Sequence, residues 1–239
     1  GRRTTPNRTK DADEAVKQLR QGAPTGEGSP HQLTNCPWCG TKIEEGRDIV
    51  VETYERGRGR TFIYCGDPLG ACPFSRAQSP DEGIPALVVD EEIYRRLPAL
   101  LVATVDKFAQ MPWNGCTAML FGQVNGYCER HGYRSPEIED SDQHPKRQDL
   151  PAARTRPVEP LRPPDLIIQD ELHLISGPLG TLVGLYETAV DQLASWEVNG
   201  KLVHPKVIAS TATIRRASSQ VHNLFLRRVK VFPPHGLDA

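Results

Sequence analysis

The segment at residues 165–173 reads Asp-Leu-Ile-Ile-Gln-Asp-Glu-Leu-His, and the interpretation of the whole chain depends on it. Its apolar centre is typical of a strand buried on both faces, and two prolines before it end any preceding helix. Asp170 and Glu171 follow at the end of that strand, where open α/β sheets bind ligands. One carboxylate there would hold a hydrated Mg²⁺, and the other would orient or deprotonate a water that attacks a phosphate. The alternative is an ordinary strand end whose acids point at solvent.

A second short apolar run, Lys-Val-Ile-Ala-Ser-Thr-Ala-Thr at 206–213, ends in small hydroxyl residues. A long amphipathic segment at about 180–198 lies between the two runs. The order strand, helix, strand predicts a parallel sheet within an α/β fold, and the right-handed crossover rule places both strand ends at one edge. We therefore expect two groups of side chains to meet there: Asp170, Glu171 and His173 with Ser210, Thr211 and Thr213.

These segments resemble motifs of the superfamily 2 helicases. Asp-Glu-Leu-His resembles their Asp-Glu-x-His box, and Thr-Ala-Thr is similar to their Ser-Ala-Thr motif. The phrase Ala-Thr-Val-Asp-Lys-Phe, which ends an apolar run predicted as a buried strand at 100–105, resembles the segment that touches the nucleic-acid backbone. By that resemblance Thr104 and Lys107 would contact phosphates. A strand followed by the start of a solvated helix is the alternative.

Composition predicts a soluble, cytoplasmic globular protein. The chain has 239 residues, of which 38% are hydrophobic and 25% charged, and its net charge of −1 gives no overall attraction to nucleic acid. Any basic surface that binds DNA must therefore be local. No apolar run approaches the length of a membrane span, and no signal peptide is visible. We expect no membrane partner.

The first cysteines predict a zinc ribbon at about 33–76. Cys36 and Cys39 lie in Asn-Cys-Pro-Trp-Cys-Gly, a tight turn that lets two thiolates face one cation. Cys65 and Cys72 form a longer second pair with six intervening residues, and the chain between the pairs predicts a hairpin. Four thiolates would leave no position for water, so the Zn²⁺ would be structural. Free core cysteines or disulfides are the alternatives.

A third cysteine group is harder to interpret. Cys116 and Cys128 are followed by His131, so that Cys128-Glu-Arg-His131 could form half of a second metal site, with His144 a conceivable further ligand. We expect instead small buried thiols and a surface histidine. The next stretch, 135–164, contains seven prolines and few apolar residues, and we expect a flexible, disordered insertion because it can bury little surface against its chain entropy.

A series of sequence segments, in their order along the chain, resembles the helicase-like subunit of the DISARM anti-phage defence system in particular. The segments are Cys-Pro-Trp-Cys-Gly, Val-Asp-Glu-Glu-Ile-Tyr-Arg-Arg, Gln-Asp-Glu-Leu-His-Leu-Ile-Ser-Gly-Pro-Leu-Gly and Ser-Thr-Ala-Thr-Ile. The resemblance implies part of a first RecA-like lobe. The regions expected are an N-terminal helix and linker (1–32), the zinc ribbon (33–76), a first part of the lobe (77–134), the Pro-rich insertion (135–164) and the motif-bearing part (165–239).

The resemblance also implies an ATP-dependent DNA helicase or translocase that works with a second subunit. Asp170 would bind Mg²⁺, Glu171 would act on the attacking water, and His173 with the Ser-Thr-Ala-Thr hydroxyls would couple ATP hydrolysis to DNA. A phosphate-cradling Gly-x4-Gly-Lys-Ser/Thr loop is not in this sequence, so we expect the fragment to be inactive alone.

Two other functions remain as alternatives. The first is a non-enzymatic zinc-ribbon module that binds DNA or protein, with Arg56, Arg58 and Arg60 at the hairpin tip as phosphate contacts. The second is a metal-dependent nuclease that uses Asp170 and Glu171, although no further acid or lysine lies at nuclease-like spacing.

Overall fold

The structure is a computed structural model, and it describes residues 5–22, 28–55, 58–104, 111–138, 140–147, 150–170 and 180–210, with the single residues 222, 230 and 232. The chain divides into two compact units, Gly1–Pro160 and Leu161–Ala239. Among the described residues, no helix has both the length and the apolar character that a membrane crossing requires.

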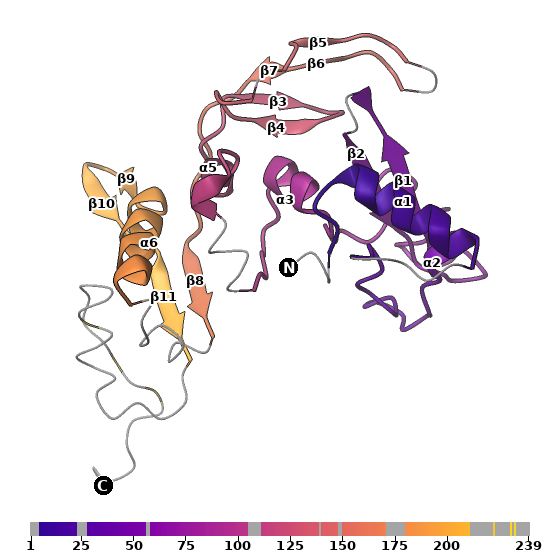
Figure 1. Cartoon of the computed structure of the whole chain (residues 1–239), viewed down its shortest axis with the longest axis horizontal. Helices are drawn as coiled ribbons and strands as arrows, with labels where there is room; N and C mark the ends of the chain where they lie inside the picture. The colour runs from indigo at the N-terminus through magenta and orange to yellow at the C-terminus, as the bar shows by residue number, and fades with distance from the viewer. Residues whose placement is uncertain are drawn as a thin grey trace, which may run out of the picture. The chain divides into compact units, whose positions relative to one another are not determined.

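The first unit is built around a helix and a hairpin. Helix α1 (Thr9–Arg20) has Asp11 in its first turn and basic residues in its last, which suits the helix dipole. Strands β1 (Ile49–Thr53) and β2 (Gly59–Ile63) pair antiparallel, as the sequence predicts for the hairpin between the cysteine pairs. The short helix α2 (Glu45–Asp48) leads directly into β1. Helix α1 packs along this hairpin (Figure 1).

One apolar core joins the helix to the ribbon. It contains Ala12 and Val16 of α1, three isoleucines of the ribbon and three residues that follow it: Ile43, Ile49, Ile63, Ile84, Val88 and Val89. Three of the cysteines belong to the same cluster. The ribbon is therefore continuous with its surroundings, and the core crosses the boundaries predicted at 32 and 76.

Helix α3 (Asp90–Arg96) has acids in its first turn and arginines in its last, which suits the helix dipole. The strand predicted at 100–105 is absent from its described residues, 100–104. The side chains of Leu100 and Val102 are 77% and 85% exposed. No strand among the described residues covers that apolar run, and the prediction of a buried strand is wrong for residues 100–104.

The rest of the first unit consists of short elements. They are a 3₁₀ helix (Met111–Trp113), α5 (Thr117–Leu120), β3 (Gly126–Cys128), β4 (Gly132–Arg134), β5 (Gln143–His144), β6 (Ala153–Arg154) and β7 (Arg156–Pro157). Strand β3 pairs with both β4 and β7, and β5 pairs with β6, all antiparallel. These strands form the upper part of Figure 1.

The Pro-rich stretch at 135–164 therefore differs from the disordered insertion that its composition predicts. Three of the short strands lie within it, and polar contacts hold them. The buried guanidinium of Arg130 donates to the carbonyls of Pro145, at 3.1 Å, and of Pro151. Arg134 pairs with Asp142 at 2.7 Å. The composition correctly indicated that this stretch buries few apolar side chains. It did not indicate the polar contacts that stabilise the paired strands.

The second unit contains the strand, helix, strand order that the sequence predicts. Strand β8 (Leu166–Gln169) is followed by α6 (Gly180–Leu193) and later by β11 (Lys206–Ala209). Strands β11 and β8 pair in parallel, side by side in Figure 1, with Lys206 opposite Leu166 and Ala209 opposite Gln169. The described residues form a two-stranded sheet in which Ile168 is 64% exposed, so the burial on both faces predicted for β8 is not present there.

A hairpin takes the place of the end of the predicted helix. Strands β9 (Trp196–Val198) and β10 (Lys201–Val203) pair antiparallel, and Asn199 and Gly200 form the two-residue turn with φ of +50° and +74°. Positive φ at both positions defines a type I′ turn, for which Asn-Gly is the favoured pair. The helix accordingly ends at Leu193 instead of near 198.

Candidate metal centre and strand-end site

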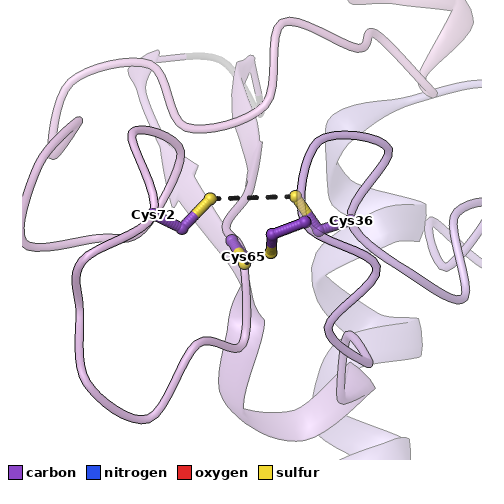
Figure 2. Close-up of side chains that lie close together, drawn as sticks. Cys36, Cys65 and Cys72 are labelled. Carbon is purple, nitrogen blue, oxygen red and sulfur yellow. Dashed lines mark hydrogen bonds between the residues drawn. The ribbon is translucent and has the colours of Figure 1, made fainter.

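The four predicted cysteines lie together. Their sulfur atoms are all within 4.8 Å of one another. Cys36 Sγ lies 3.9 Å from Cys72 Sγ (Figure 2), and Cys39 Sγ lies 3.4 Å from Cys65 Sγ. A tetrahedral Zn²⁺ with Zn–S bonds of about 2.3 Å places its sulfurs about 3.8 Å apart. The two measured distances lie on either side of that value, and none of the cysteines is in a disulfide. The cluster can therefore hold a metal such as zinc, and a full thiolate shell would make the metal structural.

The first cysteine turn is closed by backbone hydrogen bonds. The amide of Gly40 donates to the carbonyl of Cys36 at 2.9 Å, and the amide of Cys36 donates to the carbonyl of Thr41 at 2.8 Å. Gly40 has φ of +76°, a left-handed conformation that glycine adopts without steric cost. This conformation turns the chain after Cys39, so that both thiols of the motif face the same point.

The longer second turn is organised by Asp67. Its carboxylate accepts hydrogen bonds from the amides of Ala71 and Cys72, both at 2.8 Å, and of Leu69 at 3.1 Å. These bonds lower the pKa of the Asp67 carboxyl below its ordinary value. The six residues between Cys65 and Cys72 therefore form a folded loop that can present Cys72 to the other thiols. The sequence signal was Asp67-Pro68, a typical start of a side-chain-stabilised turn, which spacing alone missed.

The thiols differ in their readiness to ionise. Hydrogen bonds with Thr41 lower the pKa of the exposed Cys39 thiol to about 6, whereas burial raises the pKa values of Cys65 and Cys72. Thiols bind zinc as thiolates and release protons as they do so. Metal binding would therefore stabilise buried charges that the protein alone disfavours.

The ends of the two parallel strands form the second candidate site. Asp170 and Ser210 are the first residues beyond β8 and β11, and the Ser210 hydroxyl donates a hydrogen bond to Asp170 Oδ1. The amide of Ser210 also donates to the carbonyl of Gln169 at 2.8 Å, which continues the ladder to the edge. The structure thus brings together two predicted residues that are 40 positions apart in sequence. Glu171, His173, Thr211 and Thr213 lie outside the described residues.

The predicted nucleic-acid segment is described only in part. Thr104 is exposed at the end of the irregular stretch 101–104, and Lys107 lies outside the described residues. Their predicted contacts with phosphates stay a prediction.

The arginines of the ribbon hairpin have protein partners. Arg58 forms an ion pair with Asp140, and its side chain is only 13% exposed. The guanidinium of Arg60 lies 4.5 Å from the centre of the Phe62 ring and 3.7 Å from a Glu82 carboxylate oxygen. These contacts argue against Arg58 and Arg60 as the phosphate contacts of a DNA-binding module. Arg56 lies outside the described residues.

Two acids near this hairpin were not anticipated from the sequence, the half-buried Glu55 and the buried Glu92. Glu55 pairs with Arg130 and His131, and Glu92 on α3 is 4% exposed. Burial raises the pKa of Glu92 to about 7, against the opposing influence of Thr61, Arg96 and Arg60. Both acids lie in strongly charged sequence, where nothing distinguishes a buried acid from a solvated one.

Together, these features define a mixed α/β chain with a four-cysteine ribbon that can hold a metal and a parallel strand pair that carries an acid and a hydroxyl at one edge. The chain is 44% identical over 228 residues to the DISARM protein DrmA of Bacillus paralicheniformis. The match covers 95% of this chain and 19% of the relative, so the chain spans about a fifth of the length of that protein. No family model matches the sequence.

Proposed function

We propose that the chain is part of a DISARM anti-phage defence subunit and contributes one wall of an ATP site in a superfamily 2 DNA helicase or translocase. The defence role is supported by the 44% identity to a DISARM protein over almost the whole chain. The motor role is carried by one observation, the hydrogen bond between Asp170 and Ser210 across the ends of two parallel strands. A motor of this class needs an acid and a hydroxyl motif at the same edge of its sheet.

In this proposal the residues at the strand ends have separate roles in binding and hydrolysing the nucleotide. Asp170 would hold the hydrated Mg²⁺ that neutralises the phosphates, and the neighbouring Glu171 would orient and deprotonate the attacking water. Ser210 would fix the Asp170 carboxylate through the observed hydrogen bond. His173, Thr211 and Thr213 would transmit the state of the nucleotide to bound DNA.

The exposed faces of β8 and β11 favour a larger sheet. Parallel strands are normally covered on both faces, yet Leu166, Ile168 and Ile208 are each at least 45% exposed. We propose that further parts of the protein cover these faces and supply the loop that cradles the triphosphate. DNA and a second defence subunit are the partners that this proposal implies.

The test is Glu171→Gln in the full-length protein. Removal of a general base lowers turnover by about 10²–10⁴-fold, so DNA-dependent ATP hydrolysis should fall by that factor while nucleotide binding is retained. Glu197→Gln is the matched control, because Glu197 is an exposed acid on β9 outside the proposed site, and it should leave both properties unchanged. Normal hydrolysis in Glu171→Gln, or loss of binding and hydrolysis together, contradicts the proposal.

A further inference from the structure

A second group of metal-ligand side chains lies in the first unit, separate from the four-cysteine centre. Cys128 ends β3, His131 follows in the turn to β4, and His144 belongs to β5. All three are buried, with 2%, 5% and 6% of their surface exposed. The sequence predicted a surface histidine at 131, and that prediction is wrong.

The three side chains converge at the distances that a metal requires. Their ligand atoms all lie within 4.8 Å of one another, and Cys128 Sγ is 3.6 Å from His131 Nδ1. The rings of His131 and His144 are 4.3 Å apart, edge to face. A tetrahedral Zn²⁺ with bonds of about 2.3 Å to sulfur and 2.0–2.1 Å to nitrogen separates the two atoms by about 3.6 Å.

The surroundings of His131 match those of a metal-bound histidine. Its Nε2 lies 3.1 Å from Glu55 Oε2, while its Nδ1 is the nitrogen that faces the Cys128 sulfur. A carboxylate on the far nitrogen orients the ring and makes the near nitrogen a better ligand. Glu55 is itself held by the buried Arg130, so the ring is fixed from behind. The rings of Tyr54 and His131 also pack nearly perpendicular to each other, with their centroids 5.7 Å apart.

We propose that Cys128, His131 and His144 bind a second Zn²⁺, with water in the fourth position. The ion links the β3–β4 hairpin to the β5–β6 arm of the Pro-rich stretch. It thereby accounts for the order of a segment that has little apolar surface to bury, since small modules without a sufficient core are commonly held by a metal. Three protein ligands also leave one coordination position open to exchange.

Zinc content measured on full-length protein and its variants tests the site. Cys128→Ser and His144→Ala should each lose one equivalent of zinc relative to the wild type. Cys72→Ser should also lose one equivalent, the one held by the four-cysteine centre. His204→Ala is the matched control, because His204 belongs to the second unit and lies against Ser195 and Asp191. It should keep the full content. Folded Cys128→Ser and His144→Ala proteins that also keep the full content overturn the proposal.

Two further measurements decide the matter if a variant fails to fold. X-ray absorption at the zinc edge of the wild-type protein should show nitrogen as well as sulfur around zinc, and a shell of sulfur alone overturns the proposal. Limited trypsin digestion compares zinc-loaded protein with protein that is stripped of zinc and reloaded with one equivalent, the amount that the four-cysteine centre alone takes. Cleavage after the arm residues Lys146 and Arg147 should be slower in the zinc-loaded protein. Equal cutting rates in the two samples contradict a metal that orders the arm.

Discussion

Replacing Glu92 with glutamine tests whether a buried, ionisable acid lowers the free energy of unfolding of the first unit at neutral pH. Glu92 lies on α3 with 4% of its surface exposed, and burial raises the pKa of its carboxyl from 4.5 to about 7. The folded state therefore holds the proton more tightly than the unfolded state does. The contribution of Glu92 to stability is therefore largest below pH 4.5 and is lost as the pH rises through about 7, because folding must then either retain a proton or bury a charge.

The size of the effect follows from the pKa. A rise from 4.5 to about 7 corresponds to about 3 kcal/mol in full, of which about 2 kcal/mol is lost between about pH 5.5 and 8.5. Glutamine has nearly the same shape and cannot ionise. The stability difference between Glu92→Gln and the wild type should therefore shift by about 2 kcal/mol in favour of the variant over that range.

Chemical denaturation with zinc present, followed by circular dichroism at both pH values, measures this difference. Glu14→Gln on α1 is the control, because Glu14 is exposed and pairs with Lys10 across one helical turn. Its stability difference should not change with pH. A Glu92→Gln difference that is the same at both pH values refutes the reasoning.

Three further predictions concern the ribbon and the hairpin of the second unit. Cys72→Ser should lose one zinc and lower the melting temperature, because the thiol lies in the same core as Ile43 and Ile63; an unchanged melting temperature contradicts this shared core. Asp67→Ala should weaken zinc affinity by about 10–100-fold in competition with a coloured chelator, since it removes the acceptor for three amides of the second turn, and unchanged affinity would assign the turn to spacing alone. Gly200→Ala should destabilise the β9–β10 hairpin by about 1 kcal/mol in a thermal unfolding assay, because φ is +74° and the added methyl group meets no neighbour.

Periodicity and residue spacing correctly predicted the secondary-structure elements whose residues follow a recognisable pattern along the chain. The apolar runs ending at Asp170 and Ser210 were correctly predicted as parallel strands, because their order along the chain restricts the topology. The Cys-x-x-Cys turn and the hairpin after it were predicted from local signals, since each is fixed by residues a few positions apart. The roles of Asp170 and its neighbours in ATP hydrolysis stay a prediction.

The errors arose where distant contacts decide. The run at 100–104 has the composition of a buried strand but no described strand to pair with, so its side chains stay exposed. A local signal was missed at the end of α6: Trp196 continues the helical spacing, but Asn199-Gly200 directly after β9 favours a hairpin. Nothing local predicts the meeting of Cys128 with His144, because a loop of polar residues separates them and the contacts of Arg130 fold that loop.

The contact between Asp170 and Ser210 underlies the proposed motor, and a double-mutant cycle of ATP hydrolysis in the full-length protein tests it most directly. The variants are Asp170→Asn, Ser210→Ala and the combination, each measured for turnover and for Mg²⁺-nucleotide affinity. If the hydroxyl acts through the carboxylate, the double variant should be no worse than Asp170→Asn alone. Effects that multiply independently, or full turnover in Asp170→Asn, would contradict a shared nucleotide site at this edge of the sheet.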